Sequence, residues 1–141
     1  MVIVKANEDS EAAKLPDESM LSAMGKFNEE LVNAGIMLAG EGLHPSSKGK
    51  RIYFTGKSRT VVDGPFTESK ELIAGFWLWQ VKSIDEAVEW VKRMPAPHAE
   101  MPESTNVEIR QVFEMPDFGE LSPEVVEREA RLRAKIQEKK G

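Results

Sequence analysis

Apolar and polar residues follow two periods along this chain, one of two residues and one of three to four. Short runs rich in β-branched and aromatic residues indicate strands, because such side chains fit a pleated surface. Longer runs with apolar residues at every third or fourth position indicate amphipathic helices. The pattern predicts strands over residues 2–4, 36–39, 51–55, 59–62, 72–81 and 106–115, and helices over about 16–34, 84–94 and 122–141.

The ends of the predicted helices carry sequence signals of their own. Asp17 or Ser19 stands where a side chain would cap the first helix, and Gly35 stands where a left-handed residue would end it. Ser83 and Glu86 form the Ser-x-x-Glu pattern of a capping box before the second helix. These signals predict helix boundaries as well as helix positions.

The segment 72–81 is the most apolar strand of the chain. Phe76 and Leu78 point to one side of it, and Trp77 and Trp79 point to the other. An antiparallel strand with a solvated face should alternate apolar and polar residues, which this strand hardly does. We therefore expect one face to be covered by helices of the same protomer and the other by a second subunit.

The elements follow the order β-α-β, then a hairpin, then β-α-β. This order is typical of the ferredoxin-like α+β plan, in which both helices lie on one face of an antiparallel sheet. We expect a domain over residues 1–115 with the hairpin inserted in it, and a mostly helical extension over 116–141. From Ser122 onward six basic and four acidic side chains give a charge of +2, against −7 for the remainder. The extension is therefore either docked on the acidic body or a partner subunit, or a solvated helix.

Composition excludes several classes of protein. The chain has 141 residues and a net charge of −5, and this acidic balance argues against a nucleic-acid surface. It has no cysteine, which excludes disulfides and thiolate chemistry and fits a cytoplasmic location. No apolar run approaches about 18 residues, and the short apolar start lacks a basic segment, so we expect neither a membrane span nor a signal peptide.

Two residues are candidates for catalysis. His44 lies beside two glycines and before Pro45, and a histidine there could act as a general base near neutral pH. The alternative is a loop histidine that makes local hydrogen bonds, which is the stronger interpretation for His98 in its proline-rich loop. Asp63 could orient a histidine or accept a substrate proton, or its carboxylate could cap the turn formed by the following Gly-Pro.

Other side chains are candidates for binding a ligand. Glu41 adds a carboxylate near the same loops, and Arg51 and Tyr53 of the predicted hairpin could hold an anionic group. Trp77 and Trp79 could line a ligand cavity, although such residues more often belong to a core or a dimer interface. The two histidines lack the spacing of a zinc site, and residues 40–42 lack the further glycine of a dinucleotide loop, so we expect neither metal nor cofactor.

Several short motifs occur together in the chain. They are Asp63-Gly64-Pro65-Phe66 followed by the segment 67–71, and Gly75-Phe76-Trp77. Residues 27–31 with Ala34-Gly35, residues 42–45, the helix over 83–91 and the strand over 107–112 accompany them. Together these motifs resemble the YCII-related family, in its DGPF-domain branch, over about residues 1–113.

The resemblance implies a fold of the dimeric α+β barrel group, with two protomers paired through their sheet faces and a cavity between sheet and loops. Shorter YCII relatives carry a proposed His–Asp catalytic pair with the histidine on the first helix. The corresponding position here is Met24, whose thioether cannot transfer protons. Some relatives resemble accessory proteins linked to extracytoplasmic-function sigma factors.

Three functions are therefore open. The first is a cytoplasmic homodimer that binds a small anionic or aromatic molecule without turnover. The second is a small enzyme, with lyase, isomerase or dehalogenase-like activity, that uses His44 with Asp63 or Glu41. The third is an accessory or regulatory interaction protein that uses its C-terminal helix or its loops and, as the resemblance implies, is linked to transcription through sigma factors.

Overall fold

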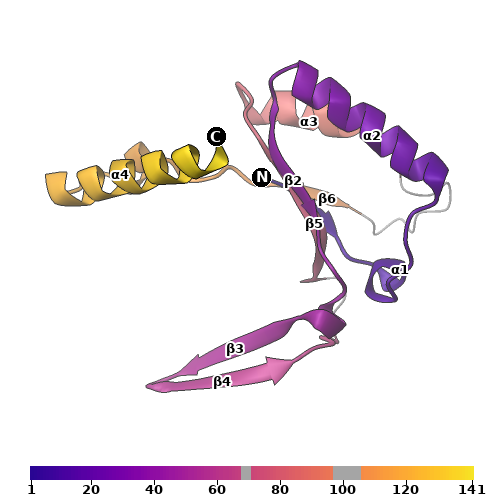
Figure 1. The fold of residues 1–141 in the computed structure, drawn as a ribbon, viewed down its shortest axis with the longest axis horizontal. Coiled ribbons are helices and arrows are strands. Elements are labelled where there is room, and N and C mark those ends of the chain that lie inside the picture. Colours follow the sequence, from indigo (N-terminus) through magenta and orange to yellow (C-terminus); the bar gives the residue numbers. More distant parts are fainter. Residues whose placement is uncertain (68–70, 97–105) are drawn as a thin grey trace. The chain divides into compact units, whose positions relative to one another are not determined.

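A computed structural model describes residues 1–67, 71–96 and 106–141 of the chain, which divides into two compact units, Met1–Arg110 and Gln111–Gly141 (Figure 1). The first unit holds β1 (Val2–Lys5), α1 (Glu8–Glu11), α2 (Glu18–Asn33), β2 (Met37–Gly42), a 3-10 turn (Ser46–Lys48), β3 (Lys50–Thr55), β4 (Ser58–Asp63), β5 (Ile73–Trp79), α3 (Ile84–Lys92) and β6 (Val107–Ile109). The second unit holds a 3-10 turn (Met115–Phe118) and α4 (Pro123–Lys140).

Four strands form an antiparallel sheet in the order β2-β5-β1-β6. Strand β1 precedes α2 and β2 follows it, and in the same way β5 precedes α3 and β6 follows it. The strands before the helices are central in the sheet, and the strands after them are at its edges. The predicted mixed α+β fold is therefore confirmed, and the strand order is consistent with the ferredoxin-like plan.

The core of the first unit lies between the sheet and the two longer helices, α2 and α3. Phe27 and Leu31 of α2 and Ala87 of α3 are buried against Val2, Ile36, Trp77 and Trp79. The Phe27 ring meets Trp77 and Trp79 edge-on, with centroid separations of 6.3 and 6.4 Å, which is a favoured geometry for aromatic pairs. The sequence pattern correctly placed both tryptophans on one face of β5.

The helix boundaries follow their sequence signals with one difference. Asp17 caps α2 by accepting the backbone N–H of Met20 at 2.8 Å, and Gly35 follows the helix with φ of 72°. At α3, the Ser83 hydroxyl accepts the backbone N–H of Glu86 at 3.1 Å, as predicted. The Glu86 carboxylate, however, accepts the N–H of Lys82 at 2.6 Å, one residue before the position expected in a capping box.

The short helix α1 was not predicted from the sequence pattern. Asn7 Oδ1 accepts the N–H of Ser10 at 2.8 Å, and Ser10 Oγ accepts the N–H of Asn7 at 2.9 Å. Such reciprocal capping can stabilise a single helical turn, but four residues are too few to show an apolar period. The polar segment after β1 is therefore helical where the pattern indicated only the end of a strand.

The predicted last strand over 106–115 is too long. Strand β6 spans only Val107–Ile109. Its partner strand β1 begins at Val2, which pairs with Ile109, so the pairing of the two strands ends there. One more backbone bond, from the N–H of Arg110 to the carbonyl of Met1 at 2.8 Å, closes the pairing. Residues 111–114 alternate in sequence, but none of the strands in the described ranges pairs with them.

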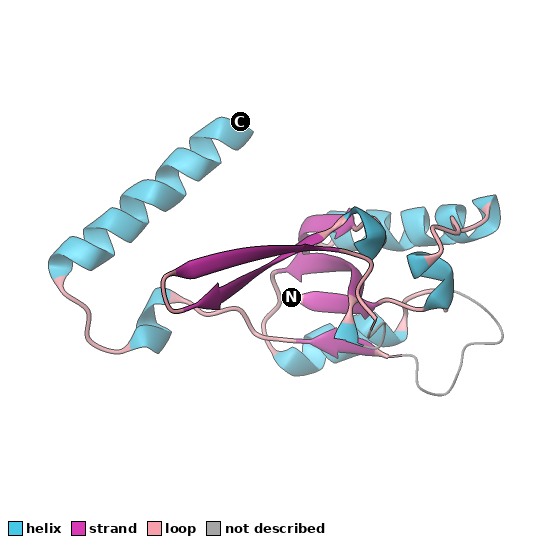
Figure 2. Ribbon diagram, turned by 90° about the horizontal axis from the view of Figure 1, so that it is seen from below, coloured by secondary structure: helices cyan, strands magenta, loops and turns pink. Residues whose placement is uncertain are grey.

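Strands β3 and β4 form a separate hairpin, as predicted. Six residue pairs connect them, from Lys50 opposite Asp63 to Thr55 opposite Ser58. A two-residue turn joins the strands, and Gly56 adopts φ of 57°, which glycine reaches without a Cβ penalty. Figure 2 shows this hairpin extending beyond the four-stranded sheet.

The second unit confirms the predicted C-terminal helix. Helix α4 begins at Pro123 after Ser122, and proline is well suited to the first helical position because its missing N–H needs no partner there. Ion pairs four residues apart link Glu124 to Arg128 at 2.7 Å and Glu129 to Arg133 at 2.8 Å. Before the helix, the rings of Phe113 and Phe118 lie with their centroids 5.3 Å apart.

Candidate functional site

One face of the sheet carries an apolar row that lies away from α2 and α3. Because Val2 and Trp77 face the helices, their strand neighbours Ile3 and Phe76 point to the opposite face. Strand pairing extends this row to Glu41 on β2 and Glu108 on β6. We call this surface the open sheet face, and its other members are Ala39, Ala74 and Leu78.

Charges border the open sheet face at its β6 edge. Lys5 Nζ lies 3.2 Å from the Glu108 carboxylate, and an Arg110 guanidinium nitrogen lies 3.6 Å from it. At the β2 edge, Glu41 is exposed and pairs across the strands with Phe76. An apolar centre with charged edges is the surface on which a ligand or a second sheet could be held.

The loops around the hairpin base meet at Ser46. The carboxylate of Glu11 accepts the backbone N–H of Ser46 at 3.0 Å and also its hydroxyl. The same hydroxyl oxygen accepts the N–H of Phe66 at 3.0 Å. Ser46 therefore joins α1, the loop after β2 and the segment that follows the hairpin.

The Asp-Gly-Pro-Phe turn packs tightly against that loop. The N–H of Gly64 donates to the carbonyl of Gly49 at 3.0 Å, and the Gly64–Pro65 peptide bond is cis. A Cβ atom on Gly64 would lie 1.8 Å from the Ser46 carbonyl oxygen, so no side chain fits at this position. The turn connects the hairpin to the sheet, which is a structural role.

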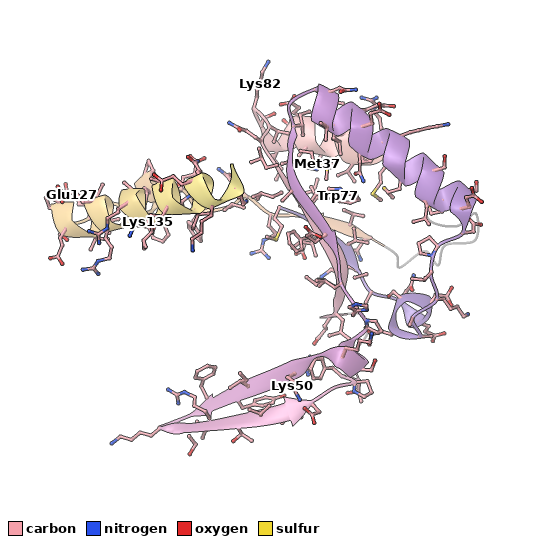
Figure 3. The ribbon with its side chains drawn as sticks, viewed as in Figure 1. Met37, Lys50, Trp77, Lys82, Glu127 and Lys135 are labelled. Atoms are coloured by element: carbon pink, nitrogen blue, oxygen red, sulfur yellow. The ribbon has the colours of Figure 1, made fainter. Side chains whose placement is uncertain are left out.

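Asp63 and His44 belong to the segments that meet at Ser46, but no hydrogen bond or ion pair connects these two described residues. The Asp63 carboxylate pairs with the ammonium group of Lys50, its partner across the hairpin. Figure 3 labels Lys50 on the hairpin. His44 is exposed and makes no hydrogen bond or ion pair with any residue that the structure describes. His98 lies outside the described residues.

Trp77 and Trp79 belong to the core and not to the open sheet face. The Trp77 indole N–H donates to Asn28 Oδ1 of α2 at 3.0 Å, and its ring covers Gly40 of β2. The indole N–H of Trp79 is buried, and none of the described residues accepts a hydrogen bond from it. Both rings lie on the helix side of β5, opposite to Glu41.

The remaining candidates, Arg51 and Tyr53, lie on the hairpin. The Arg51 guanidinium stacks over the Phe66 ring, 4.0 Å from its centroid, which holds the base of the hairpin against the turn. Tyr53 is exposed further along β3. The structure therefore distributes the seven predicted residues over three places: the hairpin and its base, the β2 edge and the core.

Ile3 and Glu108 are members of the open sheet face that sequence reasoning did not name as candidates. Both could have been found from strand alternation, because each directly follows a residue that turns toward the helices. Their position beside Phe76 depends on strand pairing, which the pattern along one strand does not reveal.

A metal site needs several ligating side chains close together, and a membrane span needs a long apolar helix. Within the described ranges, no three side chains of His, Cys, Asp or Glu are grouped so that they could hold a metal ion. None of the helices in those ranges combines the length and the apolar character needed to cross a bilayer.

Comparison with known proteins assigns the chain to a family. The model of the YCII-related domain matches residues 1–116, so the chain belongs to the YCII-related family. A protein of Rhizobium meliloti (strain 1021), described as uncharacterized, is 29% identical over 80 residues. That similarity covers 57% of this chain and 64% of the relative.

Proposed function

We propose that the protein is a cytoplasmic homodimer of the dimeric α+β barrel type that binds a small molecule beside its paired sheets. The observation that carries the proposal is the open sheet face, where Ile3, Phe76 and Leu78 form an apolar surface away from the helices. An antiparallel sheet that faces water on one side normally carries polar residues there. A second copy of the same face would bury these side chains.

The ligand proposed for this site has an apolar or aromatic part and a hydrogen-bond donor. Phe76 supplies an aromatic surface, and its cross-strand neighbour Glu41 supplies an exposed carboxylate at the edge of the sheet. A pocket that buries most of a small ligand usually combines an apolar lining with a few polar groups that orient it. Glu41 would be the orienting group.

Binding without turnover fits the positions of the polar residues better than catalysis does. Asp63 is paired with Lys50, and His44 has no described partner that would orient it as a base. Met24 occupies the helical position that carries histidine in shorter relatives, and it packs against the core. We also propose the DGPF branch of the family, because Asp63-Gly64-Pro65-Phe66 connects the hairpin to the sheet here.

A thermal-shift screen of small metabolites tests the binding proposal. A ligand that binds only the folded state raises the melting temperature, and the rise grows with the logarithm of the ratio of its concentration to its dissociation constant. We expect at least one compound to stabilise the protein and Glu41→Gln to reduce that effect. Glu29→Gln, on the exposed side of α2, is the matched control and should leave the effect unchanged.

Three results would contradict parts of this proposal. A broad library without any stabilising compound would remove the support for a small-molecule site. A compound that stabilises the protein and Glu41→Gln equally would place its site elsewhere. Light scattering at micromolar concentration tests the homodimer, which a monomeric mass would exclude.

A further inference from the structure

The hairpin of β3 and β4 has no sheet to join. Among the described strands, β3 and β4 pair only with each other, and neither belongs to the four-stranded sheet. An isolated two-stranded hairpin is marginally stable in water, because it has no covered face that excludes solvent. A hairpin of six residue pairs therefore calls for a contact that stabilises it.

The hairpin exposes large apolar side chains on both of its faces. Ile52, Phe54 and Val61 lie on one face, and Tyr53 and Val62 lie on the other. These five residues are between 42% and 72% exposed, and Phe54 is the most exposed of them. Large apolar side chains exposed together on one small element usually mark an interaction site.

The area of this surface matches what a dimer needs. If each of the five side chains offers about 165 Å², near the lower end of the range for aromatic residues, the exposed fractions on the two faces together leave roughly 450 Å² per hairpin. Two hairpins and the surfaces that they would cover then give about 1,800 Å², within the range of a stable interface. One hairpin on an unrelated small partner would bury only about half of that area.

The charge of the hairpin and the direction in which it extends also favour a second copy of this chain as its partner. Residues 50–63 hold four basic side chains and one acidic one, a net charge of +3, so the remainder of the −5 chain carries −8. A second copy therefore presents an acidic body to a basic hairpin, which favours association. Figures 1 and 2 draw the hairpin leaving the end of the sheet on the side away from α2, toward the space that a partner on the open sheet face would fill.

We infer that the hairpin is an arm that packs its apolar faces on the body of a second copy of this chain. The inference rests on the proposed homodimer and adds a contact that the open sheet face does not supply. In this arrangement each protomer contributes one arm, so the contact forms twice and closes the dimer. The stacking of Arg51 on Phe66 would hold the base of the arm in place.

The experiment compares the dimer dissociation constants of the full chain and three variants by sedimentation velocity. Ile52→Thr/Phe54→Thr removes apolar area while keeping residues that favour strands, and we expect it to raise the constant about tenfold or more. Thr55→Ser/Thr60→Ser changes only polar positions of the same hairpin, and its constant should stay within about twofold of the unaltered protein. Leu78→Ser tests the open sheet face independently.

A second measurement on the unaltered chain covers the case in which the threonine variant loosens the hairpin itself. Amide hydrogen exchange of residues 50–63 is measured above and below the concentration at which the dimer forms. We expect exchange in this segment to slow when the dimer forms, because a packed arm opens less often. Exchange that is independent of concentration would overturn the inference.

The outcomes separate the arm from the proposed homodimer. If Ile52→Thr/Phe54→Thr dimerises like the unaltered chain, the arm inference fails and the homodimer stands. If Ile52→Thr/Phe54→Thr dimerises more weakly and Leu78→Ser dimerises like the unaltered chain, the arm inference is supported and pairing through the sheet faces is contradicted. An unaltered chain that stays monomeric at every concentration would overturn both.

Discussion

The indole N–H of Trp77 donates a hydrogen bond to Oδ1 of Asn28 at 3.0 Å, linking β5 to α2 across 49 residues of sequence. The neighbouring Trp79 has a buried indole N–H that finds no acceptor in the part of the chain that the structure describes. The tryptophan pair therefore has one satisfied donor, and that donor depends on a single side chain of the helix.

Asn28→Ala should destabilise the protein by about 1–3 kcal/mol, because it leaves the N–H of the buried Trp77 without an acceptor. Chemical denaturation followed by tryptophan fluorescence measures the change. Asn33→Ala, at the exposed end of the same helix, is the control. Equal free energies of unfolding for the two variants would show that the bond contributes little.

Ser46→Ala should also lower the free energy of unfolding, by about 1–3 kcal/mol. The substitution removes the acceptor for the Phe66 N–H and one of the donors to the Glu11 carboxylate. Ser47→Ala changes the exposed neighbour in the same turn and should have a smaller effect. If the two variants have the same stability, the junction does not depend on the Ser46 hydroxyl.

Two glycine substitutions should act in opposite directions. Gly64→Ala places a Cβ within 1.8 Å of the Ser46 carbonyl oxygen, so the loop must move, at a cost of about 1–3 kcal/mol or more. Gly25→Ala lies in the exposed part of α2 with open space around it, and should stabilise the helix by about 0.5–1 kcal/mol. Thermal unfolding of both variants checks the two signs, and a Gly64→Ala variant as stable as the unaltered chain would contradict the close packing.

Leu31→Ala should give the largest loss of stability among these changes, about 2–5 kcal/mol. Leu31 is completely buried where α2 meets the sheet, so truncation leaves a cavity. The adjacent Val32 is 57% exposed, and Val32→Ala should change the free energy of unfolding by less than about 0.5 kcal/mol. A small loss for Leu31→Ala would mean that the helix can settle onto the sheet and fill the space.

Much of the fold can be predicted from local patterns. The limits of α2 follow from an apolar period and from Asp17 and Gly35, and the hairpin follows from two short strands around Gly56. These signals act over a few residues, because a cap or a turn forms bonds with its immediate neighbours in the chain. Strand alternation also indicates that Trp77 and Trp79 share a face.

The candidate site was harder to predict, because its chemistry depends on contacts between distant residues. Whether Asp63 is free to act as a base depends on the pairing register that brings Lys50 opposite to it. The length of β6 depends on where β1 lies, and the exclusion of Trp77 from the open sheet face depends on which side α2 covers. Local patterns along the chain therefore indicate the elements and the two faces of β5, whereas folding selects the face that is buried and the partner of each charged group, since burial and ion pairing are properties of segments brought together in space.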